Sequence, residues 1–181
     1  LEPSTLFNGN AKTGKFNKVK SLPSFFPTEK YKVQQFEASS TDGTKIPYFV
    51  VSSKSLKLDG TNPTLLYAYG GFEIPMLPSY NATTGTAWLE KGGVYVLANI
   101  RGGGEFGPKW HQAGLKAKRQ IVYDDFHAVA ENLIERKITS PKKLGIFGGS
   151  NGGLLVGVAF TQRPDLYNAV VCAVPLLDMK R

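Results

Sequence analysis

The chain of 181 residues has almost no cysteine, and its single one is Cys172. One thiol excludes an internal disulfide framework, so the sequence fits a reducing compartment and predicts a cytoplasmic protein. Cys172 lies in the apolar run 169–174, where we expect it to belong to the core. Residues 1–15 have neither a basic start nor an apolar stretch, so they show no secretory signal.

Histidine is almost as scarce, because the sequence holds only His111 and His127. Neither is spaced with acidic residues as metal ligands are, and the one cysteine is isolated, so we expect no metal centre. His127 falls in an amphipathic stretch beside Phe126, and His111 falls in a loop-like stretch beside Trp110. We expect both histidines to have structural roles.

Charge is missing from the nineteen residues between Lys143 and Arg163, which meets the length criterion for a membrane span. Six glycines lie in this window, however, and Ser150 and Asn151 stand at its middle. A buried strand, a turn and a helix explain the same composition, so we expect no membrane segment. The net charge of +8 is scattered without a basic stripe, which argues against a nucleic-acid partner.

Residues 1–30 contain three prolines and show neither the period of a strand nor that of a helix. We interpret them as a linker or as the tail of another domain. From residue 31 the pattern changes, and two strand-like stretches flank the Asp42-Gly43 turn. This arrangement predicts a hairpin at the start of a second unit, residues 31–181.

Continuous apolar runs in the second unit are typical of strands that are buried on both faces, as in a parallel sheet. The expected strands are 64–69, 93–100, 144–147 and a stretch around Val170. Helices are expected at 82–91, at 122–134, where apolar residues recur at helical spacing, and at 152–162. The alternation of strand and helix predicts an α/β fold, doubly wound around a mostly parallel sheet.

The segment Gly148–Gly153 places Ser150 between glycines, directly after the expected strand 144–147. This G-x-S-x-G pattern is that of a nucleophile elbow, a strained turn from strand to helix that exposes the serine hydroxyl. The functional interpretation is a serine nucleophile activated by a histidine, with the backbone N–H of Asn151 donating to the oxyanion.

A second glycine motif, 102–107, matches G-x-G-x-x-G after an expected strand, with Asp124 and Asp125 about twenty residues later. It is the strongest competing interpretation, a dinucleotide site. The acidic pair, however, falls inside an expected helix, whereas a ribose-binding acid belongs at the end of the second strand. We therefore expect no cofactor and interpret these glycines as a tight turn.

In α/β-hydrolases the catalytic acid and histidine follow the nucleophile in the sequence. Only Asp165 and Asp178 are acidic after Ser150, and no histidine follows it. Asp165 is expected to shape the turn after the elbow helix, and Asp178 follows the next strand, one strand too early for the acid. The catalytic triad is therefore incomplete in these residues.

Three segments, 67–72, 98–107 and 148–153, together resemble the prolyl oligopeptidase family of serine peptidases. The resemblance extends from about residue 31 to residue 181. It implies that residues 31–181 are the N-terminal part of an α/β-hydrolase domain, truncated before its last strands. It also implies that residues 1–30 are a linker or the tail of an absent β-propeller domain.

The resemblance implies roles that spacing does not supply. Ser150 would attack the scissile carbonyl, while the Asn151 N–H and the Tyr69 hydroxyl would form the oxyanion hole. Phe72 and Leu176 match positions that line the family's proline-binding pocket. The implied activity is hydrolysis of short peptides after proline, through an acyl-enzyme.

The family's catalytic acid and histidine, and its propeller, are absent from these residues, so we expect the chain alone to be nearly inactive. It would need the missing propeller and hydrolase segments as partners, in cis or in trans. Three alternatives stay open: a related oligopeptidase or acyl-peptide hydrolase with another pocket preference, an esterase of the same fold, and a non-catalytic remnant of a split gene.

Overall fold

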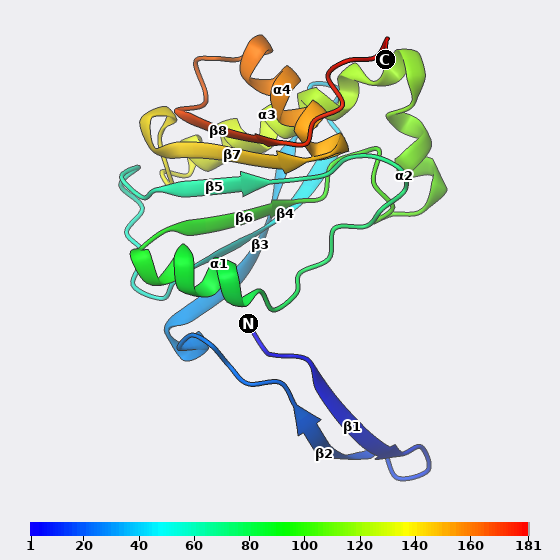
Figure 1. Ribbon diagram of the computed structural model, residues 1–181, viewed down its shortest axis with the longest axis vertical. Helices are drawn as coiled ribbons and strands as arrows, with labels where there is room; N and C mark the ends of the chain where they lie inside the picture. Colours follow the sequence, from blue (N-terminus) through cyan, green and yellow to red (C-terminus); the bar gives the residue numbers. More distant parts are fainter. Residues whose placement is uncertain (181) are drawn as a thin grey trace.

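The computed structural model describes residues 1–180, and its centre is a six-stranded sheet (Figure 1). The strand order is β3-β4-β6-β5-β7-β8. The strands are β3 (Tyr31–Ser39), β4 (Lys45–Ser53), β5 (Thr64–Tyr67), β6 (Val94–Ala98), β7 (Leu144–Gly149) and β8 (Ala169–Ala173). The pairs β3-β4 and β4-β6 are antiparallel, whereas β5-β6, β5-β7 and β7-β8 are parallel. The prediction of an α/β fold with a mostly parallel sheet is confirmed.

The predicted hairpin is formed by β3 and β4. Its turn is closed by hydrogen bonds from the Gly43 N–H to the Ser40 carbonyl and from the Ser40 N–H to the Thr44 carbonyl, both 2.9 Å long. Gly43 has a φ of 83°, which glycine adopts without the steric cost of a side chain. The Asp-Gly pair therefore sets the register of the antiparallel edge of the sheet.

One face of the sheet is covered by the two longer helices, α3 (Gln120–Glu135) and α4 (Asn151–Gln162). Strand residues such as Tyr48, Leu66 and Ile146 point to this face and are completely buried. Residues of α3 at helical spacing, Val122, Phe126, Val129 and Leu133, are equally buried against them. The apolar side chains that recur every 3.6 residues along the helix therefore pack against the apolar side chains at every second position of the strands, and together they form one core.

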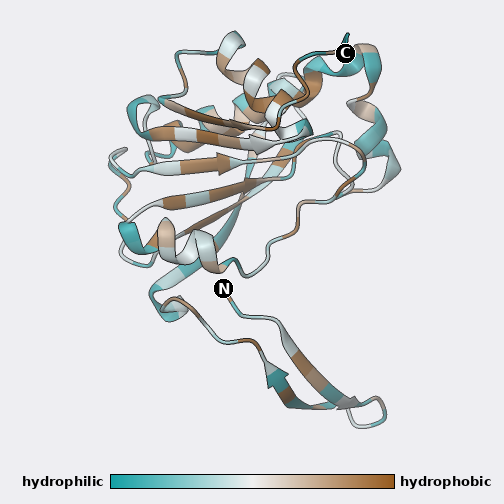
Figure 2. Ribbon diagram, viewed as in Figure 1, coloured by the Kyte–Doolittle hydropathy of each residue, from teal (hydrophilic) through white to brown (hydrophobic). Residues whose placement is uncertain are grey.

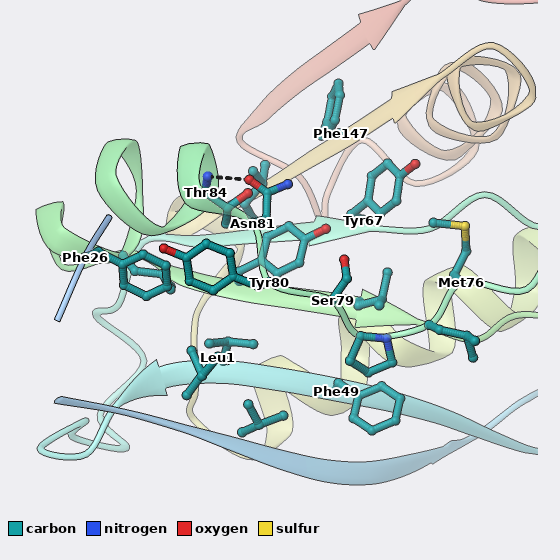
Figure 3. A pocket seen from close by; sticks show the side chains of 18 residues that line it. Leu1, Phe26, Phe49, Tyr67, Met76, Ser79, Tyr80, Asn81, Thr84 and Phe147 are labelled. Atoms are coloured by element: carbon teal, nitrogen blue, oxygen red, sulfur yellow. Dashed lines mark hydrogen bonds between the residues drawn. The ribbon is translucent and has the colours of Figure 1, made fainter. Parts of the chain in front are cut away.

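The opposite face carries the short helix α1 (Ala82–Ala87) and is only partly covered. The alternate strand residues, including Phe49, Tyr67 and Phe147, line a cavity of about 420 Å³ there (Figure 3). The rings of Tyr67 and Phe147 stack with centroids 5.4 Å apart. A sheet that is apolar on both faces needs a layer on each side, and the described residues supply one complete layer.

Residues 1–30 contain a second antiparallel sheet that the sequence pattern did not indicate, β1 (Thr5–Asn10) paired with β2 (Lys15–Ser21). This hairpin extends away from the rest of the molecule (Figure 1). Its apolar side chains, among them Leu6 and Phe16, are exposed. Figure 2 shows the brown, hydrophobic stretches of this hairpin ribbon. Because both faces of the hairpin are exposed, its sequence does not alternate, and the strand period was missing.

The uncharged window forms β7, the turn at Ser150 and α4, as predicted. Within residues 1–180, no helix is both long enough and apolar enough to span a lipid bilayer. The short helix α2 (Pro108–Ala113) was not predicted, and four single-turn 3₁₀ helices complete the described structure. These are Thr28–Lys30, Leu89–Lys91, Lys116–Lys118 and Pro141–Lys143.

Candidate active site

The centre of the sheet contains a topological switch point. Strand β5 lies between β6 and β7, and its residue Tyr67 is opposite Phe147 of β7. After β5 the chain continues to β6 on one side, and after β7 it continues to β8 on the other. In open α/β sheets, ligands bind at the carboxyl ends of the two strands where the order reverses in this way. The residues that follow β5 and β7 are therefore the candidate site.

Ser150 occupies the turn between β7 and α4, with φ 57° and ψ −117°. A positive φ is costly for a residue with a side chain and marks a functional constraint when the surroundings enforce it. Its backbone is held on both sides, because its N–H donates to the Ala173 carbonyl at 3.0 Å and its carbonyl accepts from the Leu154 N–H at 3.1 Å. The residue itself is exposed. This geometry matches the predicted nucleophile elbow.

The flanking glycines are required by close packing. A Cβ on Gly148 would collide with the Gly152 carbonyl, and one on Gly153 would lie 2.8 Å from the Ala173 carbonyl oxygen. Such distances are shorter than real Cβ contacts, so a side chain at either position would displace the backbone. The glycines allow α4 and the segment after β8 to approach the serine turn closely.

Asn151 and Tyr69 are brought together by the fold. The side chain of Asn151 is buried, and its Nδ2 donates to the Tyr69 carbonyl at 2.6 Å. Its Oδ1 accepts a hydrogen bond from Arg119 at 3.0 Å, and the same guanidinium donates to the Gly70 carbonyl at 2.7 Å. Arg119 carried no signal in the sequence, since it ends a basic stretch that is typical of solvated surface.

Phe72 and Leu176 are both exposed. Phe72 follows the Gly70-Gly71 pair after β5, in the left-handed region with φ 56°. Leu176 lies in the segment after β8, where Pro175 packs beside Gly153 of α4. Both residues are on segments that lead away from the carboxyl edge of the sheet.

The glycine loop after β6 does not have the layout of a dinucleotide site. Asp125 lies on α3 and pairs with Arg101 at 2.6 Å, and both side chains are buried. Arg101 also contacts Asp42 in the hairpin turn at 2.5 Å. Hydrogen bonds from Arg101 lower the pKa of Asp42, and the two carboxylates raise the pKa of the guanidinium. Asp125, which would have to bind ribose in a dinucleotide site, is instead part of a structural ion cluster.

Both histidines are engaged in contacts away from Ser150. His127 is buried on α3, with Nδ1 2.8 Å from the Tyr167 hydroxyl. Burial lowers the pKa of His127. His111 lies on α2 rather than in a loop, so that expectation was wrong, and its Nδ1 is 2.7 Å from the Gly102 carbonyl. The described residues therefore place no histidine against the serine hydroxyl.

The remaining candidates are structural in residues 1–180. Asp165 pairs with Arg163 at 2.7 Å in the turn after α4. Cys172 is half-buried against the core and its Sγ lies 3.2 Å from the Gly153 carbonyl, so the expectation of a core position is met only in part. No cluster of three or more potential metal ligands occurs in this part of the chain.

The comparisons with known proteins agree on one family. The model of the prolyl oligopeptidase family matches residues 79–181. An uncharacterized peptidase of Sinorhizobium fredii is 67% identical over 99% of this chain and 25% of its own length. The prolyl endopeptidase of Elizabethkingia meningoseptica is 44% identical over 100% of this chain and 26% of its own length.

Solved structures give the same result. The post-proline cleaving enzyme from Rickettsia typhi superposes with a TM-score of 0.91 at 54% identity, covering 98% of this chain and 26% of that one. Oligopeptidase B from Trypanosoma brucei superposes with a TM-score of 0.90 at 34% identity, covering 98% and 25%. The chain thus spans about a quarter of the length of the proteins it matches.

Proposed function

The chain belongs to the prolyl oligopeptidase family, and on that premise we propose that it carries the nucleophile of a serine peptidase that cleaves short peptides after proline. The observation that carries the proposal is the conformation of Ser150. It is an exposed serine with a positive φ of 57°, at the carboxyl end of the strand beside the switch point. Backbone strain of this kind is retained where it serves the chemistry.

The reaction proposed for Ser150 is attack of its Oγ on the carbonyl carbon of a proline residue, so that the peptide bond after that proline is broken. The hydroxyl proton passes to a histidine and then to the departing amine, and water later hydrolyses the acyl-enzyme. The backbone N–H of Asn151 and the hydroxyl of Tyr69 would stabilise the negative charge on the carbonyl oxygen. One such donor contributes about 3 to 4 kcal/mol to transition-state stabilisation in comparable enzymes.

The specificity proposed for the site comes from Phe72 and Leu176. Both are exposed apolar residues, and they lie on segments that follow strands at the carboxyl edge of the sheet. A proline ring is flat and apolar, so it packs well on an aromatic face. The Rickettsia typhi structure is described as a post-proline cleaving enzyme, which supports proline in preference to a basic residue.

The base and the acid of the proposed triad would come from outside these residues, and the contacts of His127 with Tyr167 and of His111 with Gly102 support this for the base. We propose that a further hydrolase segment, in cis or in trans, supplies them, and that a propeller restricts entry to short peptides. Strand β8 is at the edge of the sheet, and two apolar side chains there are exposed: Val171 on the strand by 53% and Val174 after it by 80%. An additional hydrolase segment packed against this edge would bury them, which supports the proposal. The apolar face that lines the cavity in Figure 3 is only partly covered, and the additional hydrolase segment could pack on it as well.

We propose a reducing, cytoplasmic location, because Cys172 is a free thiol and proteins of oxidising compartments commonly carry disulfides. Without its partner segment the chain is proposed to be nearly inactive, because loss of one triad member lowers the rate by several powers of ten. No metal or cofactor enters the proposed reaction.

Hydrolysis by the complete enzyme, in which this chain is joined to the segment with the acid and the histidine, tests the proposal. Prolyl amides, lysyl amides, acylamino amides and simple esters are compared as substrates. The proposal expects the highest kcat/KM for prolyl amides and loss of activity in Ser150→Ala. A preference for lysyl or acylamino substrates would indicate a different oligopeptidase, preference for esters an esterase, and activity that survives Ser150→Ala would refute the assignment.

A further inference from the structure

Two consecutive backbone carbonyls after β5 are held by side chains rather than by strand pairing. The Tyr69 carbonyl accepts from Asn151 Nδ2 at 2.6 Å, and the Gly70 carbonyl accepts from Arg119 at 2.7 Å. A third hydrogen bond, 3.0 Å long, runs from the Arg119 guanidinium to Asn151 Oδ1 and connects the two side chains that bind these carbonyls. Arg119, Asn151 and the two carbonyls therefore form one continuous chain of hydrogen bonds, which we call the Arg119 clamp.

The chemistry of the two side chains fixes the direction of every bond in the Arg119 clamp. A guanidinium has only donors, so the Asn151 oxygen must face Arg119 and its NH₂ group must face the Tyr69 carbonyl. The planar fork of an arginine can reach two acceptors at once with a fixed angle between them. A lysine ammonium has no such fork, and an aspartate at position 151 would set a carboxylate oxygen against the Tyr69 carbonyl.

The backbone around the Arg119 clamp is packed too closely to adjust. Gly70 has a φ of 62°, and a Cβ there would lie 2.8 Å from Val122 at the start of α3. A Cβ on Gly71 would lie 2.5 Å from Asn151 Nδ2. Arg119 is the residue before α3, and its guanidinium lies 5.6 Å from the centre of the Tyr123 ring. The clamp thus connects the strand end, the serine turn and α3.

We propose that Arg119 is a positioning residue that sets the distance between the two oxyanion donors, the Asn151 N–H and the Tyr69 hydroxyl. This inference rests on the proposed function. The same two residues that would donate to the oxyanion are tied to each other through the Asn151 side chain, and Arg119 orients that side chain. Donors that are held in place before the reaction stabilise the transition state without reorganisation, so loosening the clamp weakens catalysis and leaves substrate binding unchanged.

The test compares Arg119→Lys with Arg136→Lys in the complete enzyme. The two arginines flank the same helix, because Arg119 precedes α3 and Arg136 follows it. Arg136 contacts Asn132 and the Phe36 ring instead of the serine turn. Both substitutions keep the charge, so they differ mainly in the hydrogen bonds that are lost. kcat and KM are measured on a prolyl amide, and the inhibition constant is measured for a peptide aldehyde ending in proline, which forms a tetrahedral adduct with a serine.

Arg119→Lys is expected to lower kcat about tenfold to a hundredfold, as small misplacements of catalytic groups do, with KM within about twofold. The aldehyde should bind weaker by a similar factor, because its adduct carries the oxygen that the two donors bind. Arg136→Lys should change neither constant. Should Arg119→Lys fail to fold, Asn151→Asp, which keeps the size of the side chain and the backbone N–H, is expected to show the same loss in kcat.

Unchanged kcat in both clamp variants, or a fall that Arg136→Lys reproduces, would overturn the inference. So would a change in KM alone, because that pattern indicates substrate binding. The control Ser150→Ala distinguishes failure of the proposed role of Arg119 from failure of the proposed peptidase function. If Ser150→Ala abolishes activity while the clamp variants are normal, only the role of Arg119 fails, whereas activity that survives Ser150→Ala removes the proposed function and the inference with it.

Discussion

Asn151 and Tyr69 are 82 positions apart in the sequence, yet a 2.6 Å hydrogen bond joins the side-chain amide of one to the carbonyl of the other. The contact connects the residue after the proposed nucleophile with the second residue after the end of β5. Because β5 and β7 are adjacent and parallel, their carboxyl ends meet at the same edge of the sheet. The site is thus a consequence of strand order, and it depends on the close approach of two glycine-containing turns.

Gly71→Ala tests that close approach. The added Cβ would lie 2.5 Å from Asn151 Nδ2, so the Asn151 side chain or the turn after β5 must move. We expect the free energy of unfolding to fall by about 1–3 kcal/mol, the usual cost of an overpacked site. Urea unfolding measures the change. Gly145→Ala on β7 is the matched control, since its Cβ would meet nothing closer than 3.6 Å. Equal effects of the two substitutions would show that the packing around Asn151 is loose.

Asp125→Ala tests the ion cluster beneath the glycine loop. Asp125 is completely buried and pairs with Arg101, which is also buried, so the substitution leaves a charge without its main partner. Breaking a buried pair in this way costs about 3–5 kcal/mol of unfolding free energy. Asp165→Ala breaks the exposed pair with Arg163 and serves as the control, with little or no change expected. A small effect of Asp125→Ala would mean that water or Asp42 compensates Arg101.

The burial of His127 should make the free energy of unfolding depend on pH. Burial lowers its pKa in the folded protein, and this effect outweighs the nearby carboxylates of Asp124 and Glu131. The unfolded chain, with an ordinary histidine pKa of about 6.5, therefore binds a proton more readily than the folded one. The contribution of His127 is complete above that pH and is lost as the pH falls toward the folded-state pKa.

Denaturant unfolding at several values between pH 8 and pH 5 measures the His127 effect. The slope of unfolding free energy against pH should be positive in this range and smaller in His127→Gln, which keeps a polar side chain near the Tyr167 hydroxyl. His111→Gln is the control, because it removes the other histidine. A slope that His127→Gln leaves unchanged would assign the pH dependence to other groups.

The sequence predicted the elements whose signal is local. The turn at Ser150 was predicted because glycines and an apolar strand precede it, and it does lie between β7 and α4. Helix α3 was predicted because Val122, Phe126 and Val129 repeat at helical spacing. The N-terminal hairpin was missed because its exposed strands have no buried face. Arg119 was missed because its bonds to Gly70 and Asn151 span 49 and 32 positions. Contacts of that range depend on strand order, which no local pattern encodes.

The most direct test of the central claim is the intact mass of the protein after treatment with a proline-containing peptidyl phosphonate, which bonds covalently to an activated serine. We expect one adduct per chain in the complete enzyme, located on Ser150 by peptide mapping, and none in Ser150→Ala or in the 181-residue chain alone. An adduct on another residue, no adduct on the complete enzyme, or equally fast labelling of the isolated chain would contradict the claim that Ser150 is a nucleophile activated by a histidine from another segment.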